Sequence, residues 1–68
     1  MSLKWSYYLY SRESDGEYFC VQELTDEAAE EVVKINNPDD YEDYKLINKF
    51  DADDAGDAYV DSLGLDVF

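Results

Sequence analysis

The stretch Leu3-Lys-Trp-Ser-Tyr-Tyr-Leu-Tyr-Ser11 decides the fold. Aromatic side chains favour the pleated, half-buried backbone of a β-strand, so we expect a strand over residues 3–11. At a period of two, Trp5, Tyr7 and Leu9 fall on one face, and Tyr8 and Tyr10 fall on the other. Because both faces carry aromatic residues, the pattern leaves open which face of a sheet is covered.

A turn signal follows this strand. Ser14-Asp15-Gly16 supplies residues that tolerate a positive φ, which a tight hairpin turn requires. The next run, Glu17 to Leu24, alternates as a second strand does. The two runs therefore predict a β-hairpin.

The first helix is expected over residues 26–35. Thr25 offers an N-cap oxygen, and the acidic residues after it suit the positive end of a helix dipole. Apolar residues recur at helical spacing as far as Val33. Asn36-Asn37-Pro38 then ends the helix.

A third strand and a second helix complete the chain. The strand is expected over residues 44–50, and Asp51 is the expected N-cap of a helix over residues 52–63. Gly56 weakens a helix by about 1 kcal/mol, so its expected use is close packing against the sheet. Gly64 suits the position after the helix, and residues 65–68 form a tail that packs or adds an edge strand. The apolar stripe of this helix consists of Ala52, Ala55, Gly56, Tyr59, Val60 and Leu63.

These elements predict one small α+β domain over residues 1–68. Their order is ββαβα, and we expect an antiparallel three-stranded sheet with two helices packed on one face. The 68 residues lie near the lower limit of independent folding, but 46% hydrophobic and 16% aromatic residues argue against a disordered acidic tail.

The charge excludes several kinds of partner. The chain carries 18 Asp and Glu against 5 Lys and Arg, a formal net charge of −13. Direct binding to DNA, RNA or anionic lipid needs a basic surface that this composition does not supply. No apolar run approaches a membrane span, and the first residues lack the apolar core of a signal peptide. The single Cys20 makes no internal disulfide, so we expect a cytoplasmic protein.

Enzymatic chemistry and metal binding find little support. Without histidine there is no Ser-His or Cys-His pair, and Cys20 is expected to be a small core residue. Residues 51–57 resemble an EF-hand calcium loop at positions one, three and six. However, Ala55 and Ser62 stand where that loop needs an oxygen ligand and a bidentate glutamate. We therefore expect no catalytic, metal or cofactor site.

The acidic residues are the candidate functional residues. On the second helix Asp53 or Asp54, Asp57 and Asp61 are expected to lie on one face, about 6 Å apart at the rise of an α-helix. Seven further carboxylates are expected to extend this row, and some of the tyrosines to make exposed contacts. The carboxylates are Asp39, Asp40, Glu42 and Asp43 in a loop and Glu27, Glu30 and Glu31 on the first helix. The expected contact tyrosines are Tyr8, Tyr10, Tyr41 and Tyr44.

In size, charge and element order the chain resembles phage-encoded anti-CRISPR proteins of the DNA-mimic type. The residues 39–43 and 51–61 carry this resemblance, which rests on no diagnostic motif. It implies a non-enzymatic inhibitor, monomer or homodimer, that occupies the basic DNA-binding surface of a CRISPR effector complex. Two alternatives stay open: an acidic inhibitor of another DNA-binding protein, such as a repair glycosylase, restriction enzyme or nuclease toxin, and an acidic structural or adaptor domain of a salt-adapted organism.

Overall fold

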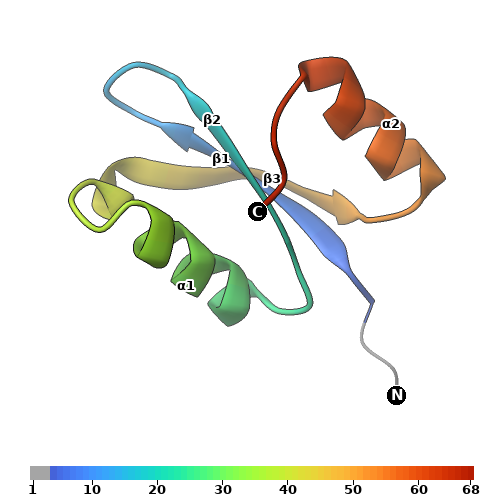
Figure 1. The fold of residues 1–68 in the computed structure, drawn as a ribbon, viewed down its shortest axis with the longest axis horizontal. Coiled ribbons are helices and arrows are strands. Elements are labelled where there is room, and N and C mark those ends of the chain that lie inside the picture. Colours follow the sequence, from blue (N-terminus) through green and yellow to red (C-terminus); the bar gives the residue numbers. More distant parts are fainter. Residues whose placement is uncertain (1–3) are drawn as a thin grey trace.

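The first strand, β1 (Ser6–Arg12), is the centre of a three-stranded antiparallel sheet with strand order β2-β1-β3 (Figure 1). The computed structural model describes residues 4–68, so the predicted strand start at Leu3 lies outside the described residues. The α+β class and the ββαβα order are confirmed. The other elements are β2 (Tyr18–Glu23), α1 (Asp26–Asn36), a 3₁₀ turn η1 (Tyr41–Asp43), β3 (Tyr44–Asp51) and α2 (Asp54–Leu63).

The predicted hairpin turn is confirmed. Gly16 has a φ of 72°, and the Asp15 carboxylate accepts a hydrogen bond of 3.1 Å from the backbone N–H of Glu17. The Asp15 side chain thus gives a hydrogen-bond acceptor to a backbone N–H within the turn, as aspartates in tight turns commonly do. The register that follows pairs Tyr10 with Phe19 and Tyr8 with Val21.

The two helices cover opposite faces of the sheet, so the prediction that both pack on one face is wrong. Tyr8 and Tyr10 pack under α1 with Val33, whereas Tyr7 and Leu9 pack with Val60 of α2. Neighbouring side chains of a strand point to opposite faces, so these two sets form two separate cores. In Figure 1 the helices lie to either side of the strands. The central strand is buried on both faces because each face carries large apolar side chains.

Both helix starts have side-chain caps, but only one is the predicted residue. The Thr25 hydroxyl accepts from the N–H of Ala28, as predicted. Asp51 is not the cap of α2, since it is still paired with Ser6 at the end of β3. Asp53 caps α2 instead, by accepting a 2.8 Å hydrogen bond from the N–H of Gly56. The helix therefore begins two residues later than expected.

The segment after α2 returns to the sheet and lies along the edge of β2. Gly64 ends α2 in the left-handed region with a φ of 67°, and the tail then runs beside β2. Phe68 exchanges two backbone hydrogen bonds of 3.0 Å with Cys20 and Gln22, which confirms the predicted edge segment. Cys20 is fully buried, as predicted. Burial raises the pKa of its thiol.

The outer edge of β3 has no strand partner among residues 4–68. This strand carries Lys45 and Lys49, and a bulge interrupts its pairing with β1 opposite Leu9 and Tyr10. Lysines and bulges on an edge strand disfavour pairing with another chain. The edge is therefore protected against strand addition although Leu46 and Ile47 are exposed.

Candidate acidic interaction surfaces

The last quarter of the chain is an acidic segment without basic residues. Residues 51–68 contain six aspartates and no lysine or arginine, and all six aspartates are exposed. None of them forms an ion pair with the residues that the structure describes. Five of the six surround α2, and we call them the α2 acidic surface: Asp51, Asp53, Asp54, Asp57 and Asp61.

The predicted row on α2 is present on one side of the helix, away from the buried Val60. Asp54, Asp57 and Asp61 are spaced three and four residues apart, which is about 4.5 and 6 Å along a helix axis. Because α2 lies on the sheet through Gly56 and Val60, Asp54 and Asp61 point to solvent, whereas Asp57 is exposed at the margin of the helix and its carboxylate turns toward Tyr7. The spacing and exposure of these three carboxylates agree with the sequence prediction.

Two members of the α2 acidic surface are already held by the fold. Asp57 accepts a hydrogen bond from the hydroxyl of Tyr7, and this bond, followed by burial, raises the pKa of Tyr7 to about 12. Asp53 uses one carboxylate oxygen, Oδ1, for the helix cap. Asp54 and Asp61 make no side-chain hydrogen bond within the described chain. They are therefore the most available carboxylates of the row.

The acidic residues of α1 lie over the other face of the sheet and are partly balanced by lysines. Glu27, Glu30 and Glu31 are exposed on this helix, which also carries Lys34 in its last turn. Nearby, Asp26 and Lys49 form an ion pair of 2.9 Å. The hydrogen bond between them lowers the pKa of Asp26 and raises the pKa of Lys49.

The acidic loop is also on the α1 side and is organised around one arginine. The guanidinium of Arg12 contacts Asp15 and Glu17 of the hairpin and reaches Asp40 of the loop at 2.9 Å. The hydrogen bond from Arg12 is the main cause that lowers the pKa of Asp15 to about 2. Arg12 thus ties the hairpin turn to the loop and neutralises part of its charge.

The loop consequently does not extend the row on α2. Tyr41, the first residue of η1, and Tyr44, which follows η1, pack against the core beneath α1. The carboxylates of Asp39, Asp40, Glu42 and Asp43 therefore belong with the α1 side, and the α2 acidic surface belongs to the opposite face. The prediction of a single continuous row is therefore wrong: the carboxylates form two acidic regions, one on the α1 side of the sheet and one around α2.

The tyrosine predictions are partly wrong. Tyr8 and Tyr10 are 0% and 6% exposed, because the central strand is covered on both faces. Tyr41 and Tyr44 are half-buried. The sequence placed Tyr59 in the apolar stripe of the second helix, but its side chain is 43% exposed. Its position at the margin of that stripe was the only available signal of exposure.

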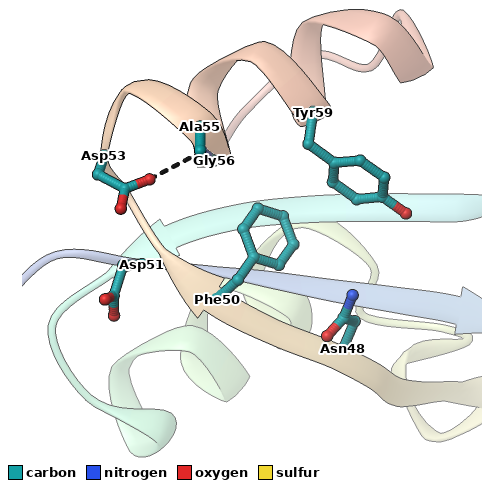
Figure 2. A pocket seen from close by; sticks show the side chains of 7 residues that line it. All are labelled: Asn48, Phe50, Asp51, Asp53, Ala55, Gly56 and Tyr59. Carbon is teal, nitrogen blue, oxygen red and sulfur yellow. Dashed lines mark hydrogen bonds between the residues drawn. The ribbon is translucent and has the colours of Figure 1, made fainter.

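Tyr59 lines an open hollow between α2 and the end of β3, with a volume of about 410 Å³ (Figure 2). Its ring meets the ring of Phe50 edge to face, with centroids 5.3 Å apart. Gly56 forms part of the wall, and an added Cβ there would lie 2.1 Å from the carbonyl oxygen of Asp51. The predicted use of Gly56 in close packing is thereby confirmed. The full lining is Asn48, Phe50, Asp51, Asp53, Ala55, Gly56 and Tyr59.

The described residues supply neither a metal-binding cluster nor a membrane-spanning helix. Within residues 4–68, no three side chains of His, Cys, Asp or Glu gather in a way that could hold a metal ion. No helix in this part of the chain has the length and apolar character needed to cross a membrane. Comparison with protein-family models, curated proteins and solved structures finds no match to this chain.

Proposed function

We propose that this protein is a non-enzymatic inhibitor that binds the basic, DNA-binding surface of another protein as a DNA mimic. The observation that carries the proposal is the α2 acidic surface. It presents five exposed aspartates on a segment that contains no basic residue, whereas arginine and lysine side chains pair with carboxylates on the α1 side. A partner rich in arginine and lysine fits this charge distribution.

The charge density supports a nucleic-acid-like role. The molecule measures 34 × 28 × 16 Å, and a duplex 34 Å long carries roughly 20 phosphates at one per ~1.7 Å. The protein carries 18 carboxylates and a net charge of −13. A small soluble domain needs a net charge of only about 2–8 in magnitude. The excess strengthens attraction to a basic partner and speeds encounter, and both effects fall with salt.

The target that we propose is a CRISPR surveillance complex in the bacterial cytoplasm. Such complexes hold target DNA in a positive channel and read a short adjacent motif with arginine side chains. A rigid set of carboxylates can pair with the same side chains. We propose the monomer as the active form, since the lysines and the bulge of β3 oppose edge-to-edge pairing.

The test is capture of purified CRISPR effector complexes by the tagged protein, followed by a target-DNA gel shift at two salt concentrations. We expect capture, loss of DNA binding and weakening of both at higher salt. The double variant Asp54→Lys/Asp61→Lys should weaken capture by about tenfold or more, because rim charges set attraction to a basic surface. This variant leaves Asp53 and Asp57, which have structural bonds, unchanged.

The matched control is Glu27→Lys/Glu31→Lys, which makes the same change of charge on α1. Equal weakening by both variants would show that net charge alone acts and would refute the assignment to the α2 acidic surface. Capture without loss of DNA binding would refute the mimic mechanism. Capture of a repair glycosylase, restriction enzyme or nuclease in place of any CRISPR complex would refute the proposed target.

A further inference from the structure

On the α1 side of the sheet, a groove of about 420 Å³ lies between α1 and the first half of β3. It exists because the core beneath α1 takes its buried residues from α1, β1 and β2 and none from β3. Leu46 of β3 pairs with Tyr10 of β1 and so faces α1, yet Leu46 is 46% exposed. The turn η1, which connects α1 to β3, borders one end of the groove (Figure 1). The volume lies within the range of small-molecule pockets.

The base of the groove carries a hydroxyl group without a hydrogen-bond partner. Tyr10 lines the groove and is only 6% exposed, and its hydroxyl makes no hydrogen bond within residues 4–68. Unlike the hydroxyl of Tyr8, it is not sealed from the surface. Burial is the main cause that raises the pKa of Tyr10 to about 12, and the charge of Glu30 adds to the rise, so the hydroxyl lies near Glu30. A ligand that donates a hydrogen bond here would satisfy a nearly buried polar group.

The charged residues of the rim have both signs and are not paired with one another. Lys34 follows Glu30 by one turn of α1, but its ammonium lies over the ring of Tyr41, 5.5 Å from the centroid. Lys34, Glu30 and Glu42 form no ion pair within the described chain. Lys45 also borders the groove, but alternation along β3 turns its side chain to the other face of the sheet. The groove therefore offers carboxylates and a separate ammonium beside an apolar wall.

A zwitterion with an apolar body matches these groups better than an ion of one sign. An anion would have to approach a protein with a net charge of −13. A simple cation is attracted to every acidic segment and has no group for Lys34. An α-amino acid carries an ammonium with three donors and a carboxylate on the same carbon. Its side chain can cover the apolar wall that Val33, Tyr44 and Leu46 form.

We propose that this groove binds a free α-amino acid with a large apolar side chain. The ligand's ammonium would donate to the Glu30 carboxylate and to the Tyr10 hydroxyl oxygen, and its carboxylate would meet Lys34. Its side chain would lie against Tyr44 and Leu46. This inference does not depend on the proposed function, because the groove lies on the α1 side of the sheet and the α2 acidic surface lies around the other helix.

The first experiment titrates the ¹⁵N-labelled protein with L-phenylalanine. We expect saturable shifts in the millimolar range, confined to amides that border the groove, such as those of Val33, Tyr44 and Leu46. Phenethylamine lacks the carboxylate and 3-phenylpropionate lacks the ammonium, so each should bind the groove about fivefold more weakly. L-Serine lacks the apolar body and should cause no saturable shift.

Variants of the lining residues test each contact. Glu30→Gln and Lys34→Gln should each weaken L-phenylalanine binding by about two- to fivefold, since exposed charge pairs contribute modestly. Glu31→Gln is the matched control, because it makes the same change on α1 outside the groove, and it should have no effect. Tyr10→Phe should weaken binding by about fivefold and leave the urea midpoint unchanged or higher, because the lost hydroxyl has no partner within the protein.

Three results would overturn the inference. One is N-acetyl-phenylalanine amide binding as tightly as L-phenylalanine, which would make the groove a docking site for an apolar side chain of another protein. Another is an equal loss of binding in Glu31→Gln and Glu30→Gln, which would reduce the effect to net charge. The last is an absence of saturable shifts at the groove with L-phenylalanine.

Discussion

Gly56→Ala provides the sharpest test of how α2 is seated on the sheet, because two physical effects predict opposite signs. Helix propensity alone makes alanine better than glycine by about 1 kcal/mol in a helix interior. In this structure, however, a Cβ at residue 56 would lie 2.1 Å from the backbone oxygen of Asp51 and 3.3 Å from the ring of Phe50. Contacts of Cβ atoms below 3.0 Å essentially do not occur, so α2 must move by about 0.9 Å or more.

The expected net effect is a loss of stability. Overpacking of a well-packed contact costs about 1–3 kcal/mol and occasionally more, and here the obstacle is backbone that cannot rotate away. Because that obstacle is rigid, we expect a cost in the upper part of this range, about 2–3 kcal/mol, and a net loss of about 1–2 kcal/mol after the gain in propensity. Small domains have only about 0.05–0.15 kcal/mol of stability per residue, so this loss is a large share of the total. The melting temperature should fall by roughly 4–16 °C.

The assay is urea unfolding followed by circular dichroism, with hydrogen exchange to locate the change. Ala55→Gly is the matched control, because residue 55 is exposed on the neighbouring helical position and should lose only about 1 kcal/mol from propensity. Exchange should rise in α2 and remain low in α1, since the helices pack on separate cores. A Gly56→Ala protein as stable as the wild type, or more stable, would refute the close approach of α2 to β3.

Four further outcomes follow from the contacts of the core and the hairpin. Tyr8→Phe should stabilise the protein by about 1 kcal/mol, because the Tyr8 hydroxyl is buried without a hydrogen bond in residues 4–68 although Asp26 and Lys49 are near enough to influence its pKa. Tyr7→Phe should cost about 1 kcal/mol, because it removes a hydrogen bond to a carboxylate of α2. A urea midpoint equal to that of the wild type would contradict the prediction for the variant that shows it. Arg12→Gln should lower the urea midpoint more than Lys34→Gln does at low salt, because Arg12 contacts three carboxylates. The difference between the two variants should shrink in about 1 M NaCl, where charges are screened within about 3 Å. A difference that does not depend on salt would exclude these ion pairs as its cause. The pKa values of Tyr7 and of Tyr10, for which burial is the main cause, are raised to about 12, so the stability that these groups contribute is fully present below pH 10 and is lost as the pH rises toward 12. Tyrosinate absorbance at pH 11 should therefore stay below that of the urea-unfolded chain, and complete ionisation with an unchanged circular dichroism spectrum would contradict this.

Much of the local structure could be predicted because its causes are local. The turn at Gly16, the Thr25 cap and the end of α2 at Gly64 each depend on a few adjacent residues with special φ angles or cap oxygens. The element order follows from periodicity of the same kind. The exposed row at Asp54, Asp57 and Asp61 was also predictable, since helical spacing places these residues opposite the apolar stripe.

The start of α2 shows where local reasoning ends. Asp51 and Asp53 are equally good caps as residue types, and only pairing of Asp51 with Ser6 across the sheet keeps that residue in β3. The N-cap preference, about 1 kcal/mol, is the same for both residues because both are aspartates. The strand pairing that separates them involves Ser6, which lies 45 positions earlier in the chain, so no local pattern reveals it.

The sequence by itself determined the α+β class, the order of the elements and the excess of negative charge, since these depend on composition and short-range periodicity. Only the tertiary structure decided that α1 and α2 take opposite faces of β1, because both faces of that strand offer an apolar surface of similar quality. That choice buries Tyr8 and Tyr10, divides the carboxylates into two regions, and leaves the α2 acidic surface without a basic neighbour that pairs with it in residues 4–68. The separation of the α2 acidic surface from the ion pairs on the α1 side is thus a product of packing between residues far apart in the chain, which no local pattern specifies.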